Sequence, residues 1–364
     1  MRKPVLCIFG LVVAVLVALG LVVLFSASGA NGLRLHNDTY FFMKRQCVYL
    51  VAGIVVAAIV AWFDYHEWRR HEILAWLFFS LVCVLLLAVF AFPEINGSRR
   101  WLPLKFFSIQ PSELAKLSLV ILLSVRLDRV GWRVELFKQG AFHSILLIAI
   151  VASLVIAEPD FGATMVICLT GFLLMFVAGV RIIHMLPFGI LGASVCIMLV
   201  LTNANRVARL FDENKQYQVK MALAAIGNGG ITGVGLGQSM QKHHYLPEAH
   251  TDFIFAIGAE ELGLVFSISV MVLLFMFFFI SVYIAKNASD RFGRFLVVGM
   301  MFIIFFQAVF NIGVVCKAYP TKGMALPFFS YGGTNMISSF FAVGTILSVG
   351  IHSYQDRKRQ VRRG

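Results

Sequence analysis

Ten continuous apolar segments follow one another along the chain, with polar stretches between them. A membrane-spanning helix needs about 20 predominantly apolar residues. In hydrocarbon the backbone must satisfy its own hydrogen bonds, and none of the segments alternates in polarity as a barrel strand would. The pattern therefore predicts an all-α multi-pass membrane protein with ten transmembrane helices. The segments lie near residues 5–26, 46–63, 73–92, 113–126, 142–157, 163–180, 183–202, 253–285, 292–316 and 332–351.

The composition supports this prediction. Of 364 residues, 60% are hydrophobic and 13% are charged, whereas a soluble globular domain has roughly 45–50% and 25%. These values exclude an ordinary soluble protein, and residues 1–364 are expected to form one membrane domain. On a soluble protein the formal net charge of +13 would suggest nucleic acid as a partner. On a membrane protein it indicates basic inner loops and contact with anionic lipid, so no nucleic-acid partner is expected.

The distribution of Lys and Arg predicts the orientation. These residues are enriched in the segments that lie inside if the N-terminus is inside, which places both termini on the inner side. The first apolar run, Val5 to Phe25, is longer than the about 7–15 residues of a signal-peptide core, so it is expected to remain as a helix. The outer side then receives the loops 93–112, 158–162, 203–252 and 317–331, and the basic tail 352–364 lies inside.

Chemically distinctive residues concentrate in the outer loops, so a catalytic function should face outward. The six cysteines include no CxxC pair and have no His at ligand spacing. His243, His244 and His250 are too loosely spaced with the acids to indicate a metal. We therefore expect neither a disulfide framework nor a zinc site.

The first outer cluster ends at the start of the fourth apolar segment. Ser112 is suited to cap that helix, which places Glu113 in its first turn and Lys116 three residues later on the same face. One interpretation is a helix start with a local ion pair. However, an ionisable group in a membrane helix costs roughly 2.5–3.5 kcal/mol at the centre and normally faces a polar cavity. Glu113 and Lys116 are therefore candidate site residues.

Arg99, Arg100 and Trp101 lie in the same loop, before this helix. They could anchor the chain at the membrane interface; equally, the guanidinium groups could bind a phosphate while the indole stacks on a sugar. The second cluster, residues 158–162, has the sequence EPDFG and predicts a tight turn with solvated acids. Asp160 in that turn is also placed to cap the next helix.

The third cluster closes the long loop. Its glycine-rich stretch, residues 227–237, matches neither a dinucleotide-binding motif nor a P-loop, so we expect a re-entrant or close-packed backbone segment. Asp252 directly precedes the eighth apolar segment, where an N-cap aspartate is the simple interpretation. Glu260 lies about 12 Å deeper on the same helix, and a carboxylate there needs a polar environment. This helix is expected to line a cavity, with Glu261 paired to a neighbouring helix.

The fourth cluster, residues 317–333, carries prolines and glycines between two apolar segments. It predicts a broken helix that lines a cavity. Lys322 and Ser330 are its candidate binding residues, although Lys322 could extend to the membrane interface and Ser330 could cap the last helix.

The chain resembles the SEDS family (shape, elongation, division, sporulation) in a combination of motifs: NGSRRW with QPSELAK, EPDFG, GNGGITGVGLG followed by YLPEAHTDFIFAIGAEELG, and PTKGMALPFFSYGG. The resemblance covers nearly the whole chain, and PTKG is more similar to the division members than to the rod-shape members. Thr334 and Asn335 depart from the small serines that usually follow SYGG, and the inner tails are short.

The resemblance implies a peptidoglycan glycosyltransferase that polymerises lipid II into glycan strands on the outer face of the bacterial cytoplasmic membrane, at the division septum. It implies a class B penicillin-binding transpeptidase and other division membrane proteins as partners, with the growing glycan chain on undecaprenyl pyrophosphate. The family's essential aspartate corresponds to Asp252, and its cavity residues correspond to Glu113, Lys116 and Asp160. These four are the candidate catalytic residues.

The chemistry of the residues agrees with such a transfer. A base must take the proton of the acceptor hydroxyl, and Asp252 at an outer helix end is placed for it. Cations must stabilise the departing pyrophosphate, with or without a divalent ion such as Mg or Mn. One carboxylate base and no evident protein nucleophile favour a single displacement with inversion. The candidate substrate-binding residues are Arg99, Arg100, Trp101, Lys322, Ser330 and Glu260, and Lys116 is a further candidate cation.

Two other functions stay open at this point. A transporter could flip lipid-linked precursors, but its ionisable residues should reach both membrane faces, whereas here they gather on one. A non-catalytic scaffold could recruit division proteins.

Overall fold

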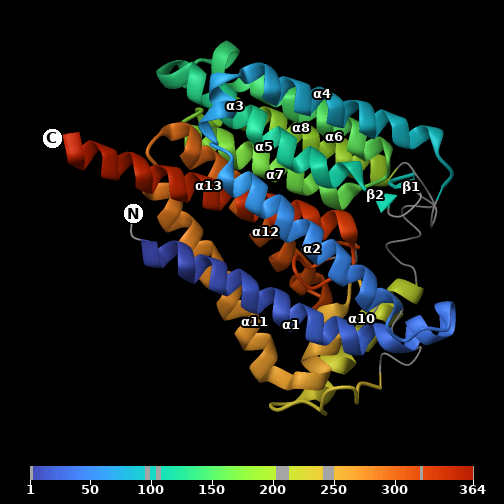
Figure 1. Cartoon of the computed structure of the whole chain (residues 1–364). Coiled ribbons are helices and arrows are strands. Elements are labelled where there is room, and N and C mark those ends of the chain that lie inside the picture. The colour runs from blue at the N-terminus through green and yellow to red at the C-terminus, as the bar shows by residue number, and fades with distance from the viewer. Residues whose placement is uncertain are drawn as a thin grey trace.

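The computed structural model describes residues 3–94, 99–103, 108–201, 213–240, 250–319 and 323–363. It is a bundle of long helices (Figure 1). Each of the ten predicted apolar segments coincides with one of them. These helices are α1 (Lys3–His36), α2 (Phe41–Trp62), α4 (Glu72–Ala88), α5 (Pro111–Val130), α6 (His143–Ala157), α7 (Phe161–Ala178), α8 (Ile182–Leu201), α11 (Ile254–Lys286), α12 (Arg291–Val315) and α13 (Gly333–Arg363).

Eight helices in the described part of the chain are long and apolar enough to cross a membrane, which confirms the all-α multi-pass class. The other two of the ten are α5, which carries several charged residues, and α8, whose apolar part Ile182–Val195 is shorter. The count of ten crossings and the orientation stay predictions. Large apolar side chains on the outside of α2 and α11 fit contact with lipid. They include Val48, Val51, Ile54, Val55, Ile59, Leu264, Val265, Ile268, Met271 and Val272.

Short elements connect the long helices: α3 (His66–Arg70), η1 (Val89–Ala91), η2 (Gly131–Glu135), the π-helical turn η3 (Phe137–Phe142) and α10 (Glu213–Gly229). Two short strands, β1 (Leu102–Pro103) and β2 (Ser108–Ile109), pair antiparallel.

The helix α10 corrects the prediction of a loop over 203–252. It folds because Val219, Ala222 and Ala225, each three residues apart, form a buried stripe, and it packs against α11.

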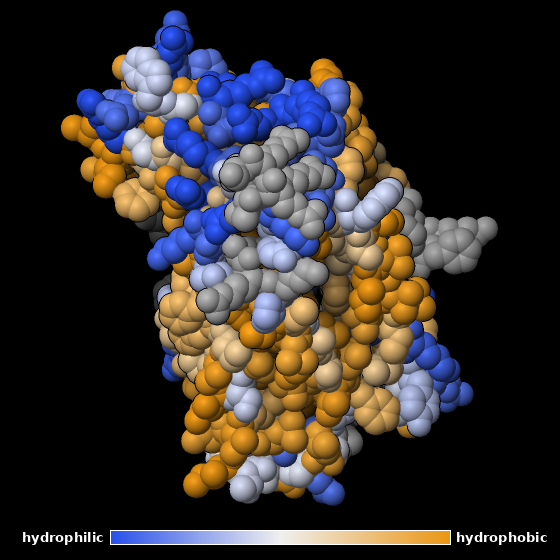
Figure 2. All heavy atoms as spheres, turned by 60° about the vertical axis from the view of Figure 1, so that its left-hand side comes forward, coloured by the Kyte–Doolittle hydropathy of each residue, from blue (hydrophilic) through white to orange (hydrophobic). Residues whose placement is uncertain are grey.

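The two ends of the bundle differ. The first residue of α1 and the last of α13 lie at one end, whereas β1, β2 and α10 lie at the other (Figure 1). We call these the inner end and the outer end, following the predicted orientation. With the end that carries the termini turned forward, hydrophilic residues gather in the upper part of the view and hydrophobic residues cover most of the remaining face (Figure 2).

The helix α11 is broken near its outer end. Gly263 has φ 72° and ψ −162°, which interrupts the helical hydrogen bonds. The carbonyls of Glu260 and Glu261 are instead satisfied by the backbone N–H groups of Val234 and Gly235, both at 3.0 Å. The glycine-rich stretch is therefore close-packed backbone, as predicted, and it lies against the break.

The fourth cluster is different from the prediction. A broken helix was expected over 317–333, but the described residues 323–332 form irregular backbone with turns and no helix. Pro327 lies in the middle of this segment, and proline has no backbone N–H to continue a helical hydrogen-bond pattern. The segment links α12 to α13 at the outer end.

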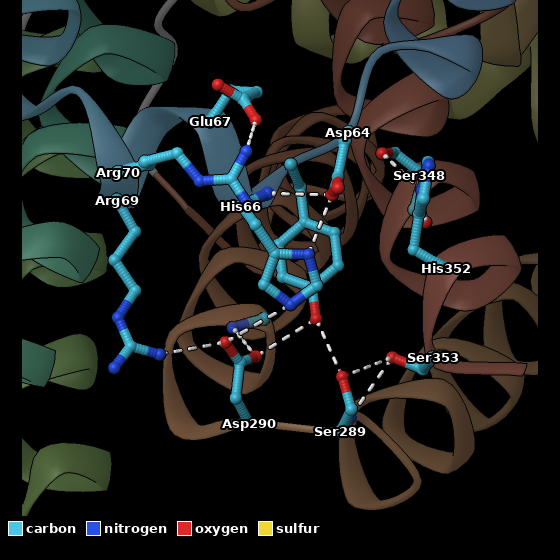
Figure 3. A network of polar contacts seen from close by, with 12 residues as sticks. Asp64, His66, Glu67, Arg69, Arg70, Ser289, Asp290, Ser348, His352 and Ser353 are labelled. Carbon is cyan, nitrogen blue, oxygen red and sulfur yellow. Dashed lines mark hydrogen bonds and ion pairs between the residues drawn. The ribbon is translucent and has the colours of Figure 1, made fainter. Parts of the chain in front are cut away.

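A polar network closes the inner end (Figure 3). Asp290 caps α12 by accepting from Gly293 N at 2.9 Å, and it also accepts from Tyr65 OH at 3.0 Å and Arg69 Nη1 at 3.2 Å. Arg69 in turn lies 3.0 Å from Asp128 of α5. We call these four residues, Tyr65, Arg69, Asp128 and Asp290, the inner clasp. It joins α3, whose cap residue is Tyr65 and which contains Arg69, to α5 and α12.

Candidate functional site

The ion pair predicted at the start of α5 is present. Lys116 Nζ lies 2.7 Å from Glu113 Oε1, and the two side chains are 1% and 9% exposed, respectively. Ser338 of α13 donates its hydroxyl to Glu113 Oε2 at 2.9 Å. A buried charge in a helix bundle is tolerated when it is paired and hydrogen-bonded. The pair therefore ties α5 to α13 inside the protein.

Both carboxylate oxygens of Asp160 accept hydrogen bonds from other groups of the protein. It caps α7 through Ala163 N at 3.1 Å, as the sequence suggested. Its other oxygen accepts from Gln110 Nε2 at 3.1 Å and Ser112 Oγ at 3.4 Å. Ser112 is therefore not the cap of α5 that we predicted. That helix begins earlier, with Gln110 at the cap position and Pro111 in its first turn, where a proline is favourable.

Arg100 is also engaged within the protein. Its guanidinium donates to Pro159 O at 2.7 Å and to Glu158 O at 3.3 Å, and it lies 3.9 Å from Asp160 Oδ1. Arg100 thus holds the EPDFG turn onto the loop before α5. Arg99 is exposed and lies 3.4 Å from Glu94.

The half-buried Trp101 precedes β1. The hairpin is attached to the helices by Thr334 of α13, which donates to Ser108 O and accepts from Gln110 N, both at 3.1 Å. Thr334, one of the two residues that depart from the usual serines after SYGG, therefore has a structural role.

Glu158 is a buried acid that the sequence analysis left unassigned. Its side chain is fully buried, and neither carboxylate oxygen has a hydrogen-bond partner within the described part of the chain. Burial, with a smaller contribution from the charge of Asp160, raises the pKa of Glu158 to about 8. The carboxyl group is therefore largely protonated at neutral pH.

Asp252 lies just before the cap residue of α11. The helix begins at Ile254, and the cap position is occupied by Phe253, whose side chain makes no cap hydrogen bond. A Cβ added to Gly323 would lie 2.5 Å from Asp252 Oδ2, so the backbone of the segment 323–332 lies directly against the half-buried carboxylate. Glycine at 323 permits this approach because it has no side chain.

Ser330 fastens these two segments together. Its hydroxyl donates to Thr251 O at 2.6 Å and accepts from Leu326 N at 2.7 Å. Tyr331 N donates to His250 O at 3.0 Å, which extends the same contact. The Ser330 side chain is 1% exposed, so its observed role is to hold the backbone around Asp252. Lys322 lies outside the described residues.

Glu260 and Glu261 are both 1% exposed, next to the break in α11. The polar environment predicted for Glu260 is supplied by Ser239, whose hydroxyl donates to its carboxylate. Glu261 accepts from Ser26 of α1 at 2.6 Å, as expected for a pairing with a neighbouring helix. Both acids therefore lie within the packed backbone.

The two groups of site residues are adjacent at the outer end. The Cγ of Met324 would lie 3.0 Å from a Cβ on Gly162, in the turn that carries Asp160. Asn311 of α12, which the sequence analysis overlooked, donates to the backbone carbonyls of Asp252 and Met324. An amide inside an apolar run was the signal that could have identified it.

A metal site with three protein ligands is not formed by the described side chains. No three His, Cys, Asp or Glu residues among those described are grouped as ion ligands. Asp160, the acid nearest to Arg100, already accepts several hydrogen bonds. The described segments therefore hold no site with three protein ligands for a Mg or Mn ion.

Fold and site together define a multi-pass helical membrane protein with a polar site at one end. The chain belongs to the cell cycle protein family of FtsW, RodA and SpoVE, whose family model, described as "Cell cycle protein", matches residues 6–355.

Individual proteins agree with that assignment. A relative from Trichlorobacter lovleyi, "Probable peptidoglycan glycosyltransferase FtsW", is 36% identical over 93% of this chain and 91% of its own length. The Rod shape determining protein RodA of Thermus thermophilus has a similar structure, with a TM-score of 0.70, 27% identity and coverage of 96% and 97% of the two chains. A chain of a peptidoglycan synthase complex, solved in work on the coordination of polymerization and crosslinking, gives a TM-score of 0.78, 27% identity and coverage of 96% and 98%.

Proposed function

We propose that this chain is a peptidoglycan glycosyltransferase that polymerises lipid II on the outer face of the bacterial cytoplasmic membrane during cell division. Curated relatives named for this glycosyltransferase activity match it over more than nine tenths of their length. The observation that carries the proposal is the position of Asp252. It is a half-buried carboxylate at the outer end that lies just before the cap residue of α11 and directly against the backbone of Gly323, which has no side chain.

Asp252 is the general base in this proposal. It removes the proton from a sugar hydroxyl of the acceptor. The hydroxyl oxygen forms a bond to the anomeric carbon of the donor, and the bond from that carbon to the lipid pyrophosphate breaks. The pyrophosphate leaves as an anion, so it needs no proton. A positioned base contributes typically about 10²–10⁴-fold to such a rate. One displacement without a protein nucleophile inverts the configuration of the donor sugar.

The other candidate residues have two kinds of role. Arg99, Lys322 and Trp101 remain the proposed contacts to pyrophosphate and sugar. Glu113, Lys116, Asp160, Arg100, Ser330 and Glu260 act by positioning, because each is buried or half-buried and makes its contacts within the protein. Their hydrogen bonds hold the starts of α5 and α7, the segment 323–332 and the broken α11 in one arrangement around Asp252.

The proposed partner is a class B penicillin-binding transpeptidase. Other division membrane proteins are further proposed partners, and the proposed location is the division septum. A peptidoglycan synthase complex that coordinates polymerization and crosslinking is a structural neighbour, which supports a partner of this kind. The two other functions are less well supported. A flippase should place ionisable side chains of its transport path at both ends, whereas the acids and bases of the inner clasp are paired with one another.

Proteoliposomes that contain lipid II and the purified full-length chain with its transpeptidase partner test the proposal. We expect glycan strands on a gel, formed without measurable transfer of labelled lipid II between leaflets. Transfer between leaflets without strands would favour the flippase. Neither activity, together with normal recruitment of division proteins in cells, would favour the scaffold.

A further inference from the structure

Asn311 lies near the outer end of α12 and is 2% exposed. Its Nδ2 donates to Asp252 O at 2.8 Å and to Met324 O at 2.6 Å. A side-chain amide has two N–H donors, so these contacts use both. Two carbonyl oxygens would repel the amide oxygen, and this fixes which way the amide points.

The two acceptors belong to the two segments that meet at the Asp252 carboxylate. The carbonyl of Asp252 precedes the first turn of α11, and that of Met324 lies in the irregular segment next to Gly323. Neither residue is inside a helix, so these carbonyls are not fixed by the backbone hydrogen bonds of a helix. Asn311 connects both of them to α12, a largely buried 25-residue helix.

The contact acts together with Ser330. The Ser330 hydroxyl holds the segment at Thr251, on one side of Asp252, whereas Asn311 holds the carbonyl of Asp252 itself. The backbone of the proposed base is thereby fixed from two elements. In a bound geometry a misplacement of about 1 Å can cost about 10²-fold in rate.

We propose that Asn311 is a positioning residue for the glycosyl transfer, which sets the Asp252 carboxylate relative to the segment at Gly323 through the backbones of both. The inference rests on the proposed role of Asp252 as the base. Substitution of Asn311 should therefore lower kcat and leave KM nearly unchanged, because Asn311 is buried behind the backbone and does not contact the substrate.

A packing role is the alternative, and one feature argues against it. The amide oxygen Oδ1 of Asn311 is buried without a hydrogen-bond partner in the described part of the chain. An apolar side chain of the same size would avoid this unfavourable burial. The benefit of the amide therefore lies in its two donors.

The test compares purified full-length variants with their transpeptidase partner, by initial rates of lipid II polymerisation over a range of lipid II concentrations and by thermal unfolding. Asn311→Leu removes the donors, and Asn311→Asp removes them at nearly unchanged volume. Gln307→Leu is the matched control, because Gln307 is another buried amide one turn earlier on α12. Asp252→Asn is measured in parallel.

We expect both Asn311 variants to lower kcat by about 10- to 100-fold with KM changed less than about threefold, and Gln307→Leu to change kcat less than about twofold. If Asn311→Leu does not fold, Asn311→Asp decides. Wild-type kcat in a folded Asn311 variant, an equal loss in Gln307→Leu, or failure of both Asn311 variants to fold would overturn the inference. Wild-type polymerisation by Asp252→Asn would instead show that the proposed base is wrong.

Discussion

The buried ion pair between Glu113 and Lys116 is the residue-scale feature that the sequence predicted most directly. Its two partners lie on one helix face at a spacing that fixes their contact, so no tertiary information was needed. Removing one partner leaves an uncompensated buried charge. Glu113→Ala or Lys116→Ala should therefore destabilise the protein by about 3–5 kcal/mol and reduce activity.

The measurement is thermal unfolding of the purified variants, with Glu67→Ala as the control. Glu67 pairs with the exposed Arg70 of α3. Glu67→Ala should therefore lower the free energy of unfolding by less than about 1 kcal/mol. The double variant Glu113→Leu with Lys116→Leu should unfold at a higher temperature than either single variant. Equal unfolding temperatures for Glu67→Ala and the single site variants would contradict the account.

A second prediction at the residue scale concerns Gly323, which lies against Asp252. A methyl group at this position would lie 2.5 Å from the Asp252 carboxylate, which is closer than atoms in contact allow. Gly323→Ala should lower the polymerisation rate at least about 10-fold, since a shift of less than 1 Å at a reacting group is costly. Gly332→Ala is the control in the same segment, because its nearest neighbour would be at an ordinary 3.8 Å. Similar rates for the two variants would indicate that Asp252 does not need this approach.

The roles of Arg100, Asp160 and Ser330 could not be derived from the sequence. Their residue types suit substrate binding as well as internal hydrogen bonds, and the choice depends on which segments meet in space. Arg100 contacts the turn at Glu158, far along the chain, and Ser330 contacts Thr251. Asn311 was overlooked for the same reason, since its acceptors are backbone atoms whose position no side-chain motif records.

At the scale of elements, the apolar runs in the sequence predicted the positions of the ten long helices, because a helix in lipid requires a long apolar run. The apolar runs did not predict α10 or the hairpin of β1 and β2. The apolar stripe of α10 is interrupted by polar residues. The two-residue strands are held by contacts such as that of Thr334 with Ser108 rather than by strand propensity.

The break in α11 gives a prediction at this scale. Gly263 has a positive φ, and an added Cβ would lie 2.4 Å from Gly233 N. Gly263→Ala should therefore destabilise the protein by at least about 1–2 kcal/mol and loosen the segment 230–235. Limited proteolysis and thermal unfolding measure both effects. Gly227→Ala is the control, because its Cβ would meet no atom within 4 Å; if it has the same effect as Gly263→Ala, the packed break is not the cause.

For the whole molecule, the two ends have separate roles. The inner clasp joins three elements at the end opposite the candidate site, and Figure 3 shows its contact between Arg69 and Asp290. Asp290→Ala removes the cap of α12 and two further hydrogen bonds, so it should lower the free energy of unfolding by about 2–4 kcal/mol. The kcat of the folded fraction should stay within about twofold of wild type, because no reacting group lies there.

Glu135→Ala is the control for this prediction, since its ion pair with Arg181 is exposed and should contribute little. Thermal unfolding and polymerisation rates corrected for the folded fraction separate the two effects. A loss of kcat in folded Asp290→Ala would mean that the inner end takes part in the reaction or controls it.

The initial rate of lipid II polymerisation by Asp252→Asn, in complex with the partner, tests directly whether Asp252 is the base. We expect a rate about 100-fold or more below wild type, with unchanged unfolding temperature and unchanged binding of lipid II. Asp38→Asn, which alters a carboxylate paired with the exposed Lys44 near the outer end, should keep the wild-type rate. A wild-type rate in Asp252→Asn would show that Asp252 is not the base.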